Sequence, residues 1–314
     1  MSNNSKRVVQ GEGSFDTHNL RVVPLRHPVR LVAVVMVIVL LIALLRVVIS
    51  NPDFQWPTVG RYLLAPTILH GMYVTMVLTV IVMIIATLLG TLVALMMLSP
   101  TRLLSVPATA FVWFFRGTPA LVQLILWYNL SLLFKTITLW IPGYGTVFSL
   151  PTNELMTPFV SAIVALSLQE AGYMAEIVRS GLKSVARGQT EAASCLGMKQ
   201  SLLVRRIVLP QAMRLIIPPT ANETINLLKT TSLVSTIAVS DVLYSAQAIY
   251  ARTFETIPLL LVVTCWYLAV VSIMSVGQFY LEDYFARDQT RRSGRLFRAV
   301  AENIGSFRRK EMAA

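Results

Sequence analysis

The sequence has few charged residues and few of the side chains that hold metal ions. Only 13% of its 314 residues are charged, whereas 55% are hydrophobic. A soluble domain of this length cannot bury that much apolar side chain, because the buried fraction rises slowly with chain length. The two cysteines and three histidines are not at metal-ligand spacing, which argues against a zinc site or a disulfide framework. We predict that Cys195 and Cys265 are small packing groups.

Motifs for catalysis are also missing. The sequence contains no GxxxxGK[ST] loop for binding phosphates, so the chain is not expected to hydrolyse ATP itself. A polytopic membrane enzyme is disfavoured, since no nucleophile–base or metal constellation is visible and no histidine lies in or near the long polar loop at 179–214. We therefore predict no catalytic residue, no metal and no cofactor held by this chain.

The apolar residues form blocks long enough to cross a bilayer. They predict an all-α polytopic membrane protein with about six transmembrane helices, near residues 31–49, 73–98, 103–134, 159–179, 215–244 and 256–281. In the third block, Gly117 and Pro119 break the run, which indicates either an interfacial helix before a span or a kinked span. Residues 1–30 read as a polar tail, 286–314 as a basic tail, and 50–67 and 135–157 as external connections.

The basic residues indicate the orientation. The tails, the short connection at Arg102 and the loop at 179–214 hold 21 Lys and Arg, against 3 in the external connections. Cytoplasmic loops carry this excess, so both termini are predicted to be cytoplasmic. The net charge of +12 thus reflects membrane orientation, and we predict no nucleic-acid partner.

The loop at 179–214 carries a spaced pattern, EAA-x3-G-x9-I-x-LP. Its positions are Glu191, Ala192, Ala193, Gly197, Ile207, Leu209 and Pro210. The first three begin a short helix-forming run that Gly197 can end in a left-handed conformation. A second helix should start near Lys199 and stop before Pro210. Small alanines allow such a helix to dock closely in a groove of a partner protein.

This pattern resembles the cytoplasmic loop of binding-protein-dependent ABC importer permeases. Further segments resemble polar amino acid permeases: Phe115–Leu124 (FRGTPALVQL, with Arg116, Gly117, Thr118, Pro119 and Gln123), Tyr173–Gly181 and Leu228–Leu233. The resemblance implies a five-helix permease domain at 68–285, preceded by an extra span at 31–49. The chain departs from it at Gln169-Glu170, where small or hydroxyl residues are commoner, and at Thr230, where an Asp is common.

The resemblance also implies the partners and the setting. It implies an inner-membrane protein that pairs with a second permease chain and with an ATPase dimer that uses ATP and Mg²⁺. An extracytoplasmic binding protein would deliver a polar amino acid. An osmolyte or an opine-type solute remains an alternative substrate. A secondary transporter with Glu170 as proton relay is a different class that the loop pattern disfavours.

Charged residues inside the predicted spans are candidates for the substrate pathway. Glu170 and Lys229 both fall near mid-depth, where an unpaired charge is costly. Either they meet the ammonium and carboxylate of a substrate, or they form a structural ion pair. Other candidate pathway residues are Gln169, Tyr173, Thr231 and Ser232. We further predict a local Glu176–Arg179 ion pair, and Arg116 as an interfacial anchor.

Overall fold

The computed structural model describes residues 28–143 and 145–311, and for 28–31, 139–140 and 286–311 it describes the backbone alone. The predicted tail at 1–30 therefore lies almost entirely outside the described residues. The chain divides into two units, residues 1–54 and residues 55–314. Each unit is described by itself below.

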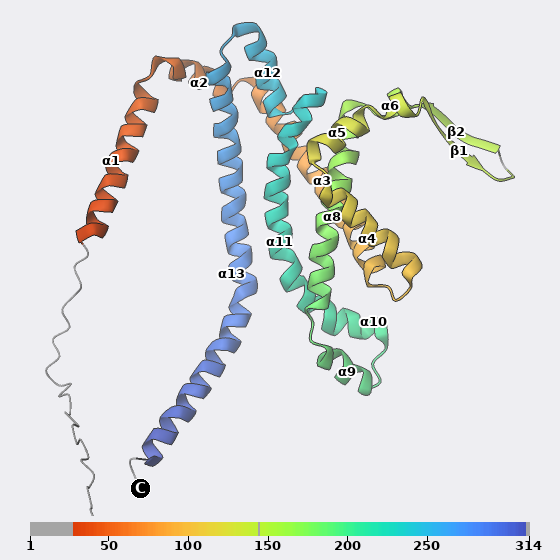
Figure 1. The fold of residues 1–314 in the computed structure, drawn as a ribbon, viewed down its shortest axis with the longest axis vertical. Helices are drawn as coiled ribbons and strands as arrows, with labels where there is room; N and C mark the ends of the chain where they lie inside the picture. Colours follow the sequence, from red (N-terminus) through yellow and green to blue (C-terminus); the bar gives the residue numbers. More distant parts are fainter. Residues whose placement is uncertain (1–27, 144, 312–314) are drawn as a thin grey trace, which may run out of the picture. The chain divides into compact units, whose positions relative to one another are not determined.

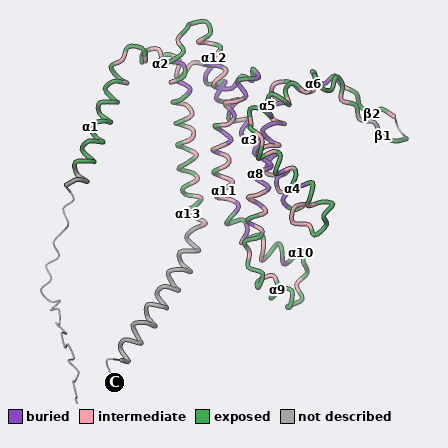
Figure 2. Tube along the Cα trace, in the orientation of Figure 1, coloured by how far each residue is buried: buried purple, intermediate pink, exposed green. Residues whose placement is uncertain are grey.

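The first unit contributes one long helix, α1 (Pro28–Ser50), followed by the short turn η2 (Pro52–Phe54). Within α1, residues 32–50 are highly apolar and none of them is buried in the protein, as the green tube in Figure 2 shows. A helix that is apolar on every side is stable in lipid, where its backbone is satisfied internally. This helix is the extra N-terminal span.

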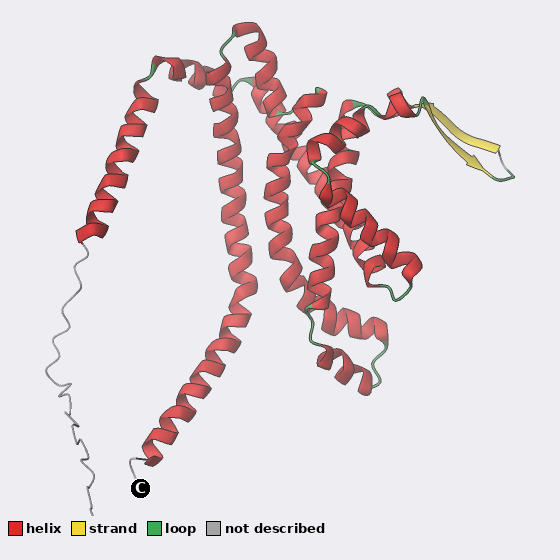
Figure 3. Ribbon diagram, in the orientation of Figure 1, coloured by secondary structure: helices red, strands yellow, loops and turns green. Residues whose placement is uncertain are grey.

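The second unit is almost entirely helical (Figures 1 and 3). Its α-helices are α2 (Trp56–Leu63), α3 (Pro66–Leu98), α4 (Arg102–Gly117), α5 (Ala120–Tyr128), α6 (Leu130–Leu133), α7 (Thr152–Leu155), α8 (Pro158–Lys183), α9 (Arg187–Cys195), α10 (Gln200–Leu203), α11 (Leu209–Thr230), α12 (Val242–Thr253) and α13 (Thr256–Glu311). The turns of π-helix η3 (Val204–Val208) and 3₁₀-helix η4 (Thr231–Ile237) flank α11. The strands β1 (Thr136–Ile141) and β2 (Gly145–Pro151) form an antiparallel hairpin.

Length and composition identify the spans. Among the described residues, α1, α3 and α13 each contain a segment long and apolar enough to cross a membrane, and two bent helix pairs raise the total to five. The sixth is α8, whose 26 residues reach about 39 Å at 1.5 Å per residue. Its Gln169 and Glu170 lower the hydropathy. About six spans result, which confirms the predicted fold class.

The core forms where α3 and α8 pack most closely. A Cβ atom added at Gly90 of α3 would lie 2.6 Å from Cβ of Met174 and 2.8 Å from the carbonyl oxygen of Ala171. Gly181 of α8 packs in the same way directly against Ile216 of α11. Small residues thus let three spans approach closely, as helix pairs in lipid generally require.

A second apolar cluster joins α2, the start of α3, α12 and α13. Ile68, Val242, Leu259 and Val262 are fully buried in it. Trp266 of α13 donates its indole N–H to the carbonyl oxygen of Leu63 at 2.8 Å. This cluster lies at the end of the second unit opposite α9 and α10 (Figure 1).

The structure corrects the prediction of an unbroken fifth span. The helix that contains α11 ends in η4 at Ile237, and α12 follows at a bend of 43°. Ala238 at the break has φ 61°, a left-handed conformation that ends the helix, and Asp241 then caps α12 by accepting from the backbone N–H of Tyr244. The hydropathy of the sequence does not reveal such a break in the backbone.

Two further predictions are wrong. Pro210 does not stop the second loop helix, because the π-helical turn η3 runs into α11 and places Pro210 in the first turn, where its missing N–H is tolerated. The cysteines are not buried packing groups either, since Cys195 on α9 and Cys265 on α13 are both exposed. In addition, the connection at 135–157 contains the hairpin β1–β2, which the sequence did not reveal.

Candidate coupling loop and substrate pathway

The helix α9 carries the first part of the spaced loop pattern and ends as predicted. Gly197 has φ 72° and donates its N–H to the carbonyl oxygen of Ser194 at 2.9 Å. The N–H of Met198 reaches the carbonyl oxygen of Ala193 at 3.2 Å. These two bonds form a Schellman motif, which satisfies carbonyls at the end of the helix. A residue with a side chain would be strained at position 197.

Most residues of α9 are exposed. Ala193 is buried against the loop, whereas Glu191, Ala192 and Leu196 are exposed, Leu196 to 82%. An exposed leucine beside small residues at the tip of a polar loop suits a docking surface for a partner protein. In Figure 1, α9 and α10 lie at the lower ends of α8 and α11, away from α12.

Hydrogen bonds connect α9 to the start of the fifth span. The side-chain amide of Gln211 donates to Oε1 of Gln189 at 2.5 Å and to the carbonyl oxygen of Ile207 at 2.8 Å. Ile207 is half-buried, whereas Leu209 and Pro210 are exposed. Because η3 continues directly into α11, a displacement of α9 can be transmitted to that span through the backbone and through the hydrogen bonds of Gln211.

The segment from Arg116 to Gln123 forms a sharp corner between α4 and α5, which are bent by 103°. Gln123 is buried, and its amide nitrogen donates to the carbonyl oxygens of Phe115 (3.0 Å) and Thr118 (3.2 Å) and to Thr118 Oγ1 (2.6 Å). Gly117 and Pro119 interrupt the helix, and Gln123 satisfies the carbonyls that the interruption frees. The predicted break at Gly117 and Pro119 is therefore a structural corner, and the hydrogen bonds by which Gln123 stabilises it were not predicted.

Arg116 connects this corner to α8. Its guanidinium carbon lies 5.1 Å from the centre of the Tyr173 ring, a cation–π geometry. Its side-chain stem passes over Gly172, where an added Cβ would lie 3.1 Å from Cγ of Arg116. Tyr173 thus holds Arg116 in place, which the expectation of a simple interfacial anchor did not include.

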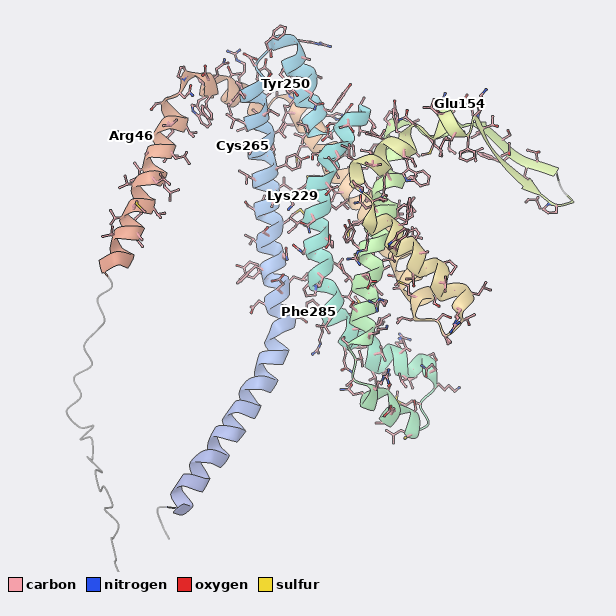
Figure 4. The ribbon with its side chains drawn as sticks, viewed as in Figure 1. Arg46, Glu154, Lys229, Tyr250, Cys265 and Phe285 are labelled. Atoms are coloured by element: carbon pink, nitrogen blue, oxygen red, sulfur yellow. The ribbon has the colours of Figure 1, made fainter. Side chains whose placement is uncertain are left out.

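Glu170 is the buried acidic group of α8. Its side chain is 7% exposed, and its Oε1 has no hydrogen-bond partner. Glu223 of α11, which is also an acid, interacts with Glu170 electrostatically. No ion pair joins Glu170 to Lys229 in the described part of the chain, and Lys229 is exposed on α11 (Figure 4). The interpretation of a structural ion pair is therefore wrong.

The remaining candidates have local roles. Thr231 is buried and donates to the carbonyl oxygen of Leu228 at 2.7 Å, and half-buried Ser232 donates to that of Lys229 at 2.8 Å. Gln169 is half-buried. The predicted Glu176–Arg179 ion pair is confirmed, with 2.5 Å between Nη2 and Oε2.

A buried polar group near the break of the fifth span was not predicted. Asp241 is fully buried, with Oδ1 bonded to the N–H of Tyr244 and Oδ2 without a partner. Next to it, Thr75 of α3 accepts from the N–H of Val242 at 3.2 Å. These bonds fix the first turn of α12 on α3 despite the bend that precedes it.

The fold and the loop that carries the spaced pattern together define a class: a polytopic helical membrane protein with an exposed loop helix, α9. The family model described as "Binding-protein-dependent transport system inner membrane component" matches residues 86–285. The chain belongs to this family and is the membrane-spanning permease component of an ABC importer.

Relatives with curated names narrow the subfamily. The chain is 42% identical to the arginine transport system permease protein ArgU of Corynebacterium glutamicum, over 90% of this chain and 89% of that protein. It is 35% identical to the nopaline transport system permease protein NocM of Agrobacterium fabrum, over 67% of this chain and 84% of the relative. The resemblance to polar amino acid permeases is thereby confirmed.

Solved structures agree with the fold. An amino acid ABC transporter crystallised with histidines is 30% identical to this chain, with a TM-score of 0.59 over 70% of this chain and 94% of that one. An inward-facing structure of the MetNI methionine ABC transporter is 16% identical with a TM-score of 0.53, covering 70% and 96%. At that identity the second match supports the fold alone.

Proposed function

We propose that this permease moves a cationic amino acid of the arginine type, delivered by an extracytoplasmic binding protein. The observation that carries the proposal is the buried Glu170, whose Oε1 has no partner and whose charged neighbour is Glu223. A positively charged substrate would stabilise the ionised form of Glu170, which burial and the charge of Glu223 both oppose. The similarity to an arginine permease supports this substrate class.

The α-carboxylate of the substrate requires a cation as well. Lys229 is exposed and makes no ion pair with Glu170. Arg116 is held over Tyr173, which lies one helical turn from Glu170 on the same face of α8. Guanidinium groups bind carboxylates in a bidentate manner, so Arg116 is the stronger candidate for this role.

The energy for transport comes from a separate ATPase dimer, which binds ATP and Mg²⁺ and engages the exposed surface of α9. This chain pairs with a second permease chain, and both of its termini face the cytoplasm, as the distribution of Lys and Arg supports. When the ATPase closes, α9 moves and Gln189, Gln211 and η3 transmit the movement to α11. The spans then alternate between outward and inward access.

Uptake of labelled substrates tests the proposal. Cells with and without this chain would be given arginine, lysine, histidine, glutamine, glutamate and nopaline at equal membrane potential. We expect selective loss of arginine uptake without the chain, and Glu170→Gln should reduce arginine uptake at least tenfold while the transporter still assembles. Glu154→Gln is the matched control, since Glu154 is exposed on α7 (Figure 4).

Each outcome has a distinct meaning. Loss of glutamine or glutamate uptake in place of arginine would overturn the cationic substrate but keep the importer. Loss of nopaline uptake alone would favour an opine, as the relative NocM suggests. Uptake that persists after ATP depletion and collapses with the proton gradient would support a secondary transporter.

A further inference from the structure

The hairpin β1–β2 is two-sided in its chemistry. In the register, Ile137 lies opposite Leu150, and Leu139 lies opposite Phe148. The alternating pairs are Thr136 with Pro151 and Thr138 with Ser149. Since directly opposite residues share a face and successive residues alternate, one face of the hairpin is apolar and the other presents hydroxyl groups.

The apolar face has little to pack against within the described chain. β2 contacts the short helix α7, and Phe148 remains 41% exposed. Val147, the extra residue at the bulge between the pairs Leu139–Phe148 and Trp140–Thr146, is 58% exposed. A two-stranded hairpin with an uncovered apolar face is marginally stable in water, so another phase or molecule must cover it.

The lack of charged residues in the hairpin indicates what covers its apolar face. From Thr136 to Asn153 the sequence contains no Asp, Glu, Lys, Arg or His, and Lys135 and Glu154 bracket the segment. Aromatic residues, here Trp140, Tyr144 and Phe148, favour the boundary between acyl chains and headgroups. By contrast, the rim of a protein–protein interface is generally polar, unlike this uncharged segment.

The position of the hairpin points the same way. The residues that lead into it, Leu132, Leu133 and Phe134, are exposed to 81%, 68% and 59%, as residues that face lipid are. The hairpin follows these exposed apolar residues and extends sideways from the helices, from the end opposite α9 and α10 (Figure 1).

We propose that the hairpin β1–β2 is an interfacial anchor that lies in the outer headgroup layer, with Phe148 and Leu150 toward the acyl chains. The membrane embedding follows from the family, whereas the assignment to the outer leaflet rests on the orientation under "Proposed function". The anchor would hold the external ends of α5 and α8 at a fixed depth while the spans move.

Site-directed spin labelling of the complete transporter tests this placement. The background would be Cys195→Ser with Cys265→Ser, reconstituted in vesicles of phosphatidylethanolamine and phosphatidylglycerol. Nitroxides would be attached at Phe148→Cys and Leu150→Cys on the apolar face, and at Ser149→Cys on the polar face. Collisions with oxygen, which concentrates in acyl chains, are compared with collisions with a water-soluble nickel chelate.

We expect the ratio of oxygen to nickel collisions to be several-fold higher at 148 and 150 than at 149. Thr253→Cys at the exposed end of α12 gives a reference label outside the hairpin. High nickel collision rates at all three hairpin positions would overturn the proposal, since the hairpin would then lie in water. Low rates for both reagents at 148 and 150 would also overturn it. If those rates changed on adding the binding protein, the binding protein would be the occupant; otherwise the second permease chain would be.

A reversed sidedness would be separately visible. If a chelate confined to the vesicle exterior reached position 149 only in transporters whose α9 faces outward, the hairpin would lie at the cytoplasmic side. That result would refute the proposed orientation and the outer-leaflet assignment but not the interfacial anchor. If arginine proved not to be the substrate, in contrast, the expected collision pattern would be unchanged.

Discussion

Arg116 and Tyr173 are joined across two spans, with the guanidinium carbon of Arg116 5.1 Å from the centre of the Tyr173 ring. This contact connects the corner between α4 and α5 to α8, the helix that carries Glu170. The corner is also held by buried apolar residues on both of its helices, Val112 of α4 and Leu124 of α5. Loss of the cation–π contact or of the Gln123 hydrogen bonds should therefore weaken the corner without removing its apolar packing.

The first prediction concerns this cation–π contact. Tyr173→Phe keeps an aromatic face and should leave the stability of the protein nearly unchanged. Tyr173→Leu removes the aromatic face. A double-mutant cycle of Tyr173→Leu with Arg116→Met should give a coupling energy of about 0.5–2 kcal/mol in the free energy of unfolding. Thermal unfolding of the transporter in nanodiscs provides the measurement, and additive effects of the two changes would contradict the contact.

The second prediction concerns the buried amide of Gln123. Gln123→Leu has a similar volume but leaves the carbonyls of Phe115 and Thr118 without their donor, so it should destabilise the protein by about 1–3 kcal/mol. Val122→Leu on the exposed side of α5 is the control, and it should have an effect near zero. Equal thermal stabilities of the two variants would show that Gln123 does not hold the corner.

The third prediction compares two glycines within spans. Gly90→Ala places a Cβ within 2.6 Å of Met174, so α3 and α8 must separate and stability should fall by about 1–3 kcal/mol. Gly277→Ala in α13 has open space around it and should be neutral or slightly stabilising, because alanine favours helix over glycine. The melting temperature should fall for Gly90→Ala and stay unchanged or rise slightly for Gly277→Ala, and a matched fall in both would refute the close approach.

The sequence predicted the elements that depend on regular patterns. Uncharged runs located the spans, and the positions of Glu191 and Gly197 located a loop helix with its left-handed end, because helix-forming residues and glycine act locally. The break at Ala238 could not be predicted in this way, since alanine normally continues a helix. The new start of α12 after the break also depends on a hydrogen bond to Thr75 of α3, far away in the sequence.

The candidate pathway was predicted only in part. Glu170 was identified because acids are rare inside spans, but depth alone did not show which way a side chain points. Lys229 was therefore considered as an ion-pair partner of Glu170, although it is exposed. Glu223, which interacts electrostatically with Glu170, was not among the candidate pathway residues. Arg116 and Gln123 were found through a motif whose geometry only the packed helices reveal.

The last prediction tests the end of the coupling helix. Gly197 has φ 72°, so Gly197→Ala forces a side chain into a strained conformation that costs about 1 kcal/mol, whereas Asn tolerates it better. We expect Gly197→Ala to lower substrate-stimulated ATP hydrolysis and uptake together by several-fold, with Gly197→Asn closer to the wild type. Gly188→Ala, within the helix and in open space, is the control and should retain activity. If Gly197→Ala lost uptake but kept stimulated ATP hydrolysis, α9 would still engage its partner and the defect would lie in transmission to α11. If both activities stayed normal, the left-handed end of α9 would have no part in coupling.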